Sequence, residues 1–362
     1  MDFVQNELEK RKVPDALVTN RGAKVKSVAQ MQKRRDEIKR ILEEEEYGKL
    51  PPKPEHLVVD KKPGVRDFCA GKAINDLLTF TATINGKEVS FPVIASIPKC
   101  DHPVPAFVHI NFRADNPDRY MPTEEIIDGG FAVFSLCYQD IALDNGDFKS
   151  KLARHLCSSR RAKSSSGKIM MWAWAAMRVM DYIMTLPEID HDNVAVIGHS
   201  RLGKTALVTA AFDERFKYAI SNDSGCSGAA ISRDKEGESI ERITNVFPYW
   251  FCPRYAENTD PFEKSYDQNF LFALIPPRHI MVGSAKEDLW ADPKSEFLNC
   301  AGANSVYKLY GMKGLVYGDD YPTAKSVLGE GDSLYHVRFG THYLSREDWG
   351  VYMDFIRSKM NK

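Results

Sequence analysis

A strand-like run that leads into Gly-His-Ser-Arg is the feature that most limits how this chain can fold. Residues 194–197 are apolar, Gly198, His199 and Ser200 follow, and a helix-forming run begins at Leu202. The pattern predicts a strand and a helix joined by a tight turn that holds the Ser200 hydroxyl clear of the backbone. A serine there suits a nucleophile, because the free amides at a helix start stabilise developing negative charge. Gly/Ser turns also occur without function, so this interpretation needs a base, an acid and a substrate pocket from the rest of the chain.

Strands and helices alternate from Pro105 to the carboxyl end. The apolar patterning predicts strands at 106–110, 131–136, 194–197, 218–221, 279–285, 306–310 and 335–339. It predicts helices at 123–128, 168–186 and 202–211, and a last helix that opens at Ser345 with a capping-box-like pattern. Residues 138–167 are predicted to be a polar loop. The alternation, without repeats or linkers, predicts an α/β fold with a doubly wound, mostly parallel sheet.

The amino-terminal third has a different pattern. Residues 28–47 carry a helix signal, and two alternating runs at 77–84 and 88–97 flank Asn85-Gly86, which is typical of an antiparallel hairpin. Such a hairpin forms one edge of a mixed sheet. We therefore expect a single domain over residues 1–362, with 1–50 as a helical extension and about 227–268 as an insertion near the active site.

The composition excludes several classes of partner. The formal net charge of -1 gives no support to nucleic-acid or anionic-membrane binding, and no apolar run is long enough to span a bilayer. Neither a Walker loop nor GxGxxG follows a strand, so nucleotide-binding folds lose support.

The seven cysteines are an odd number without a CxxC pair, which fits free thiols better than disulfides or a zinc site; pairing of Cys226 with Cys252 stays open. The first residues show no signal peptide, so we expect a cytoplasmic protein, or a secreted one if a leader has been removed.

A serine nucleophile needs a base, and in α/β-hydrolases the chain order is serine, acid, histidine. Three histidines follow Ser200. His279 begins a predicted strand and His336 lies within one, which indicates structural roles. His342 follows Gly340-Thr341 in a loop at the predicted carboxyl edge of the sheet, and it is our choice for the base.

Two carboxylates are candidates for the acid that orients the histidine. Asp288 comes just after the strand that ends at Ala285, which is the usual hydrolase position, and Asp223 follows the strand before it. Either residue also has a plain interpretation, because an aspartate after a strand often shapes a turn. We prefer Asp288 on chain order and keep Asp223 as the alternative acid.

The turn departs from the usual G-x-S-x-G motif, because its second glycine, Gly203, comes one place late. Arg201 follows the nucleophile, and Lys204 lies about one helical turn further along. Solvent-facing helix positions would explain both cations. Two cations beside a nucleophile, however, favour an acidic or polyhydroxylated substrate, and the Arg201 amide and guanidinium are both candidate oxyanion donors.

These residues resemble a known family. The run Gly198 to Lys204 is similar to the G-C/H-S-R-x-G-K motif of the glucuronoyl esterases, carbohydrate esterase family fifteen, of bacterial type. Further matches are 222–225, 247–251, 267–268, 273–278 and 288–293, and the resemblance runs from about Tyr47 to the end. It implies a three-layer αβα sandwich of the α/β-hydrolase fold. The implied reaction is hydrolysis of esters that join glucuronate or 4-O-methylglucuronate on xylan to lignin alcohols, without a metal or other cofactor.

Carried over by position, the resemblance gives Ser200 as nucleophile, His342 as base and Arg201 as side-chain oxyanion donor. It leaves the acid open, since bacterial members place it at Asp288 and fungal members have Glu at the position of Asp223. The implied substrate-binding residues are Lys204, Glu238, Gln268 and Trp290, of which Trp290 packs on the uronate.

We expect a monomer that acts on glucuronate esters of xylan fragments or of small alcohols. A carbohydrate acetyl esterase is the alternative within hydrolases, although Arg201, Lys204 and Glu238 argue against it. A noncatalytic carbohydrate-binding relative is the alternative outside enzymes, and the order of serine, acid and histidine argues against that.

Overall fold

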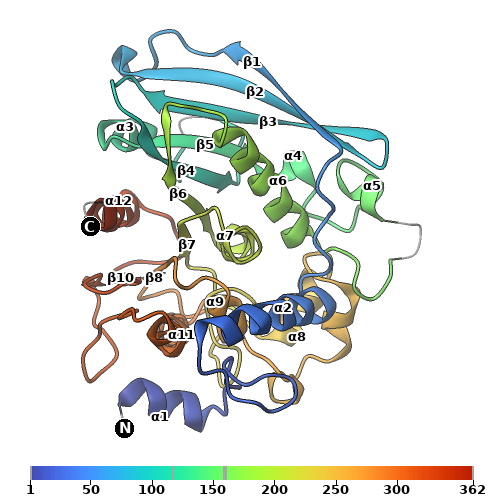
Figure 1. Cartoon of the computed structure of the whole chain (residues 1–362), viewed down its shortest axis with the longest axis vertical. Helices are drawn as coiled ribbons and strands as arrows, with labels where there is room; N and C mark the ends of the chain where they lie inside the picture. Colours follow the sequence, from blue (N-terminus) through green and yellow to red (C-terminus); the bar gives the residue numbers. More distant parts are fainter. Residues whose placement is uncertain (1, 116–117, 158–160, 361–362) are drawn as a thin grey trace.

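One mixed sheet organises the computed structural model of the chain, which describes residues 2–115, 118–157 and 161–360 (Figure 1). Within these ranges the strands lie in the order β1 (His56–Pro63), β2 (Ala73–Ile84), β3 (Lys87–Pro98), β5 (Ala132–Cys137), β4 (Val104–Asn111), β6 (Ile189–His199), β7 (Tyr218–Asn222), β8 (His279–Ala285), β10 (Leu334–Arg338) and β9 (Ser326–Leu328). The strands from β5 to β10 in this order pair in parallel. β1, β2, β3 and β9 pair antiparallel with their neighbours.

The α-helices are α1 (Phe3–Lys10), α2 (Val28–Glu45), α3 (Thr123–Asp128), α4 (Tyr138–Ile141), α5 (Ala153–Leu156), α6 (Lys168–Ile183), α7 (Arg201–Phe212), α8 (Ile240–Val246), α9 (Asn269–Ala273), α10 (Pro293–Gly302), α11 (Asn304–Leu309) and α12 (Arg346–Met360). Short 3₁₀ turns are η1 (Phe68–Gly71), η2 (Pro253–Glu257) and η3 (Pro261–Glu263). In the part of the chain that the structure describes, no helix is long and apolar enough to cross a membrane.

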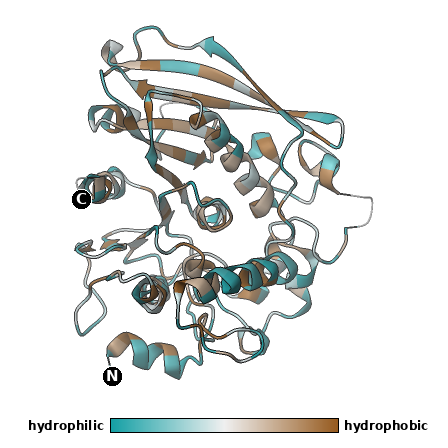
Figure 2. Cartoon of the chain, viewed as in Figure 1, coloured by the Kyte–Doolittle hydropathy of each residue, from teal (hydrophilic) through white to brown (hydrophobic). Residues whose placement is uncertain are grey.

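Successive residues of the central strands face opposite layers. In β4, Phe107 belongs to a core shared with Ile126 of α3 and Trp349 of α12, and its ring centre lies 5.1 Å from that of Trp349. The next residue, Val108, belongs to the core on the other face, which includes side chains of α6, α7 and α10. In Figure 2 the central strands are mostly brown, as expected for strands that are covered on both faces. The three-layer αβα sandwich with a mostly parallel sheet is therefore confirmed.

The predicted hairpin is present and longer than the sequence indicates. Asn85 and Gly86, between β2 and β3, have φ values of 51° and 68°. Two successive positive φ angles match the right-handed twist of the flanking strands, which is why Asn-Gly is favoured there. β1 adds an edge strand that the sequence analysis did not predict.

The predicted strand at 306–310 is wrong, because these residues fall on α11 and the turn after it. Only Ala303 separates α11 from α10, and the adjacent residues Val306 and Tyr307 are both buried, as a helix allows and a half-buried strand does not. The Tyr307 hydroxyl donates to the Arg278 carbonyl at 2.7 Å and accepts from the Ile280 amide at 3.1 Å, which ties the helix to β8.

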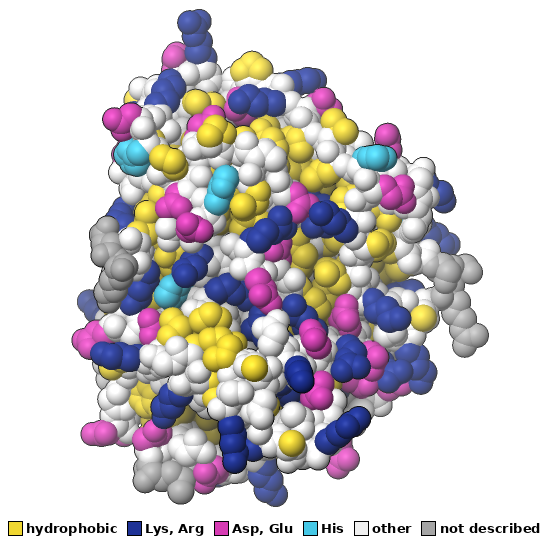
Figure 3. Space-filling view, in the orientation of Figure 1, with side chains coloured by type: hydrophobic (Ala, Val, Ile, Leu, Met, Phe, Trp, Pro, Cys, Tyr) yellow, Lys and Arg dark blue, Asp and Glu magenta, His cyan; other side chains and the backbone are white. Residues whose placement is uncertain are grey.

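Residues 138–167, predicted to be a loop, contain the short helices α4 and α5; residues 158–160 lie outside the described part. All seven cysteines are free, so Cys226 and Cys252 do not pair in this structure. Positive and negative side chains are interspersed on the face shown in Figure 3, in keeping with the net charge of -1.

Candidate active site

Ser200 is the single residue between β6 and α7. Its φ of 58° and ψ of -128° are unusual for a residue with a side chain, a strain on the order of 1–3 kcal/mol. The Ser200 amide donates to the Asn222 carbonyl of β7 at 2.8 Å, which fixes the turn. A Cβ on Gly198 would lie 2.1 Å from the Leu202 carbonyl oxygen, so the chain can fold back only over a glycine. The predicted strand-turn-helix arrangement is confirmed.

The displaced second glycine has a packing reason. Leu202, which occupies the usual glycine position, is fully buried. A Cβ on Gly203 would lie 3.0 Å from the Ser224 side chain and 3.1 Å from the Gly198 carbonyl oxygen. Gly203 therefore lets α7 approach the segment after β7, where the cavity begins.

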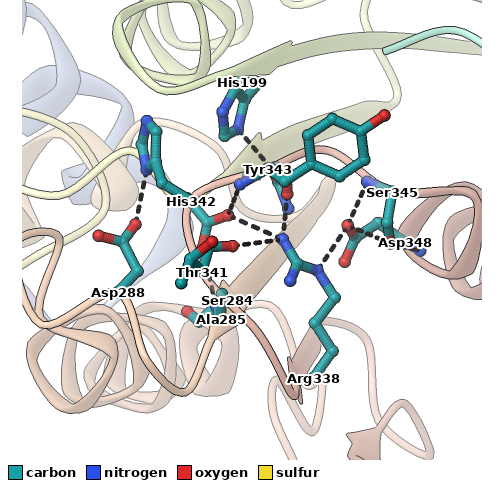
Figure 4. A network of polar contacts seen from close by, with 12 residues as sticks. His199, Ser284, Ala285, Asp288, Arg338, Thr341, His342, Tyr343, Ser345 and Asp348 are labelled. Atoms are coloured by element: carbon teal, nitrogen blue, oxygen red, sulfur yellow. Dashed lines mark hydrogen bonds and ion pairs between the residues drawn. The ribbon is translucent and has the colours of Figure 1, made fainter. Parts of the chain in front are cut away.

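His342 and Asp288 come together at the carboxyl edge of the sheet. His342 lies in the loop between β10 and α12, and its side chain is 42% exposed. Its Nδ1 lies 2.6 Å from Oδ2 of Asp288, which is buried just after β8 (Figure 4). A short contact between a carboxylate and a ring nitrogen holds the imidazole in one orientation and stabilises its charged form.

Asp223 lies close by but is held by other groups. It is buried, and its carboxylate accepts from the Ala285 amide at 2.7 Å, the Tyr343 amide at 3.4 Å and the Arg338 guanidinium at 3.3 Å. Burial raises the pKa of Asp223 well above its usual range. The geometry thus places Asp288, and not Asp223, in hydrogen-bond contact with His342.

A cavity of about 350 Å³ opens beside Ser200. The predicted site residues Ser200, Arg201, Lys204, Asp223, Glu238, Asp288, Trp290 and His342 all line it, together with Ser224, Gly225, Phe247, Trp250 and Ala291. These residues come from the segments that follow β6, β7, β8 and β10 and from the 227–268 insertion. Glu238, Phe247 and Trp250 are the lining residues that come from 227–268.

Lys204 and Glu238 form a buried pair in the cavity wall. Lys204 Nζ lies 3.5 Å from Oε2 of Glu238 and donates to the carbonyls of Ser224 and Cys226. Trp290 is 46% exposed, and the Arg242 guanidinium lies 5.0 Å from the centre of its ring. The cavity therefore combines a cation and an anion suited to hydroxyl groups with an aromatic surface suited to a sugar face.

The Arg201 side chain is held between a carboxylate and aromatic rings. Its Nη1 donates to Asp144, and its guanidinium carbon lies 4.7 Å from the centre of the Trp250 ring. Its Nε is buried and has no hydrogen-bond partner among the described residues. This unpartnered N–H group is a candidate hydrogen-bond donor.

Asp144 and Trp250 are site residues that the sequence analysis missed. Besides Arg201, the Asp144 carboxylate accepts from Trp250 Nε1 at 2.6 Å and from the Tyr138 hydroxyl at 3.0 Å. Asp144 lies in the polar segment predicted to be a loop, far from the motif in sequence, so no local pattern identifies it. Trp250 is part of a quoted family match, but its contact with Arg201 depends on the fold.

The expected substrate-binding role of Gln268 is not supported. Gln268 is buried, does not line the cavity, and donates from Nε2 to both carboxylate oxygens of Glu46 at 2.8 and 3.1 Å. Its Oε1 accepts from the Tyr47 hydroxyl at 3.1 Å. Burial raises the pKa of Glu46 to about 7. Gln268 is therefore a structural partner of the N-terminal segment rather than a group free to bind substrate.

Among the described residues, the ligand atoms of Asp223, Asp288 and His342 lie within 4.8 Å of one another, as a metal site requires. These groups already have partners: His342 and Asp288 contact each other, and Asp223 contacts the Arg338 cation. A metal ion would have to displace both contacts, so these three residues suit proton transfer better than metal binding. The metal-free reaction stays a prediction.

Comparisons with known proteins agree on one family. The profile of the family described as "Glucuronyl esterase, fungi" matches residues 80–311. The relative "Carbohydrate esterase MZ0003", from an unknown prokaryotic organism, is 32% identical over 99% of this chain and 92% of its own. A 4-O-methyl-glucuronoyl methylesterase of Schizophyllum commune is 25% identical over 83% of this chain and 74% of its own. The solved structure of a glucuronoyl esterase from Solibacter usitatus superposes with a TM-score of 0.88 at 30% identity and covers 96% of this chain and 97% of its own. By the length and identity of these matches, the chain belongs to the glucuronyl esterase family.

Proposed function

We propose that this protein is a serine esterase that hydrolyses the ester between glucuronic acid, with or without a 4-O-methyl group, and an alcohol. The observation that carries the proposal is the contact of His342 with Asp288 in the cavity that also holds Ser200, Arg201 and Lys204. The family membership and the activity of the Schizophyllum commune relative support it.

The first half of the reaction forms an acyl-enzyme. Ser200 Oγ attacks the C6 carbonyl carbon of the uronate ester, and His342 accepts the Oγ proton while Asp288 stabilises the resulting imidazolium. The carbonyl oxygen becomes an oxyanion that accepts from the Arg201 amide and from its unpartnered Nε–H. The C–O bond to the alcohol then breaks, and the alcohol leaves with the proton held by His342.

The second half releases the uronate. A water molecule gives a proton to His342 and attacks the acyl carbon, and the second tetrahedral intermediate is held by the same donors. The bond to Ser200 Oγ breaks, and Oγ regains its proton from His342. The enzyme returns to its starting state with one uronic acid and one alcohol formed from one ester and one water.

The sugar side of the cavity explains a preference for uronates. Lys204 and Glu238 offer charged partners to the ring hydroxyls, and Trp290 offers its exposed face to the pyranose. We assign Lys204, Glu238 and Trp290 to the acid half of the ester and no lining residue to the alcohol half. Esters on xylan fragments and esters of small alcohols are therefore both proposed as substrates.

The proposal is tested with two esters that share one leaving group, benzyl glucuronate and benzyl acetate. We expect kcat/KM to be at least about 100-fold higher for the glucuronate, because acetate has no sugar ring to contact Lys204, Glu238 and Trp290. Initial rates of alcohol release measure both reactions. Equal or higher rates on acetate would favour the acetyl esterase, and turnover of neither ester would favour a noncatalytic binding protein.

Replacing Asp144 by asparagine is expected to lower kcat for benzyl glucuronate by about tenfold with KM little changed. The carboxylate holds the Arg201 guanidinium and the Trp250 indole together, and a neutral amide cannot balance the charge or accept as many hydrogen bonds. Asp147→Asn serves as the matched control, because its carboxylate lies on the same segment but accepts from the Lys149 amide and the Ser150 hydroxyl instead of from Arg201. Equal losses in the two variants would show that Asp144 does not act through Arg201.

A further inference from the structure

Arg338 is a buried cation next to the loop that carries His342. It is the last residue of β10 and is 5% exposed, and His342 follows four residues later. Its Nη1 donates to the Phe339 carbonyl at 2.9 Å, and its Nη2 donates to the carbonyls of Thr341, at 3.2 Å, and Tyr343 (Figure 4). One guanidinium therefore binds the backbone on both sides of His342.

The same guanidinium also joins two buried carboxylates. Its Nε donates to Asp348 of α12 at 2.9 Å, and its Nη2 lies 3.3 Å from Asp223 after β7. Asp348 in turn accepts from the amide and the hydroxyl of Ser345 at 2.7 and 2.8 Å, which fixes the end of the loop at the start of α12. The loop from β10 to α12 is thus held at its start, its middle and its end by this one network.

The position of the His342 ring depends on this backbone. Asp288 fixes one ring nitrogen, and the buried His199 ring lies beside His342 with a centroid distance of 4.4 Å. Burial lowers the pKa of His199 well below its usual value, so this neighbour is neutral. Neither contact holds the backbone of residues 341–343, whereas Arg338 does so with donors that a smaller cation lacks.

We propose that Arg338 is a positioning residue for hydrolysis, which keeps the His342 backbone where the imidazole reaches both Asp288 and Ser200. The proposal rests on the proposed esterase function. Arg338 does not line the cavity and so acts through His342 rather than on the substrate. A displacement of about 1 Å in a general base is enough to lower a rate by about 100-fold.

The test compares Arg338→Gln and Arg338→Lys with the matched control Arg346→Gln, an exposed arginine at the start of α12 that pairs with Glu125. Two rates are measured on enzyme shown to be folded by circular dichroism: hydrolysis of benzyl glucuronate and phosphorylation of Ser200 by diisopropyl fluorophosphate, which releases fluoride. We expect both to fall by about 100-fold in Arg338→Gln and about tenfold in Arg338→Lys, with KM within twofold of the wild type. Arg346→Gln is expected to match the wild type.

A double variant separates positioning from a general loss of structure. If Arg338 acts through His342, then adding Arg338→Gln to His342→Ala lowers the residual rate no further. A further loss of the same size would overturn the proposal, as would wild-type kcat in folded Arg338→Gln. Should Arg338→Gln not fold, wild-type kcat in Arg338→Lys is the overturning result. Failure of the wild type to hydrolyse benzyl glucuronate would count against the proposed function alone, because the rate of Ser200 phosphorylation still reports on His342.

Discussion

Replacement of Ser200 by alanine is expected to lower kcat for benzyl glucuronate by at least about 10⁴-fold while leaving binding of the free uronate intact. The remaining groups provide binding and oxyanion stabilisation but no acyl-enzyme, which accounts for losses of this size in serine hydrolases. Lys204, Glu238 and Trp290 keep their places in the cavity, so the Kd for glucuronate should change little. Stopped assays of alcohol release and calorimetric titration with glucuronate measure the two quantities.

Ser224→Ala is the matched control for this experiment. Ser224 lines the same cavity, but its hydroxyl is bound within the fold, as it accepts from the Ser221 hydroxyl at 2.7 Å and from the Ala229 amide at 2.8 Å. We expect a loss of less than about tenfold there. If Ser200→Ala kept more than a hundredth of the wild-type kcat, another nucleophile would have to be sought.

The second large effect is expected at Asp288. Asp288→Asn should lower kcat by about 10⁴-fold, because an amide neither stabilises the imidazolium nor favours the tautomer that leaves Nε2 free to act as base. Asp223→Asn should lower it by about tenfold or less, because Asp223 contacts the Arg338 side chain and two backbone amides rather than the imidazole. Its main effect should be on thermal stability, since Arg338 then lacks one of its two carboxylate partners.

Steady-state kinetics of the two variants, together with their melting temperatures, measure these effects. A larger loss of kcat in Asp223→Asn than in Asp288→Asn would show that the acid follows the fungal arrangement. Similar losses in both would indicate that the two carboxylates act as one coupled unit.

The parts of the fold that could be predicted are those fixed by local patterns. The turn at Ser200 and the Asn85-Gly86 hairpin need particular backbone angles, and the residues that allow them are visible in the sequence. His342 could be chosen because only three histidines follow Ser200, and His279 and His336 fall on predicted strands. The preference for Asp288 rested on the usual chain order of hydrolases. In the structure Asp223 differs from Asp288 because it contacts Arg338, and this contact joins residues 115 positions apart.

The errors arose where long-range contacts decide the structure. The alternation at 306–310 suits a strand, but in the structure Tyr307 lies on α11, where its hydroxyl contacts residues 278 and 280. Gln268 lies in a segment typical of the family, yet its partner Glu46 is more than 200 residues away. Asp144 belongs to a polar stretch with no distinguishing pattern, and only the folded chain brings it to Arg201.

The dependence of Arg201 on Asp144 and Trp250 limits how this site can be transferred to another protein. A designer who grafts only residues 198–204 onto a different α/β scaffold would reproduce the strained turn and the nucleophile. The grafted arginine, however, would lack the carboxylate that anchors one end of its guanidinium and the ring that lies beneath it. The smallest transferable unit is therefore discontinuous: it comprises the turn, the segment around residue 144 and the aromatic stretch at 247–250.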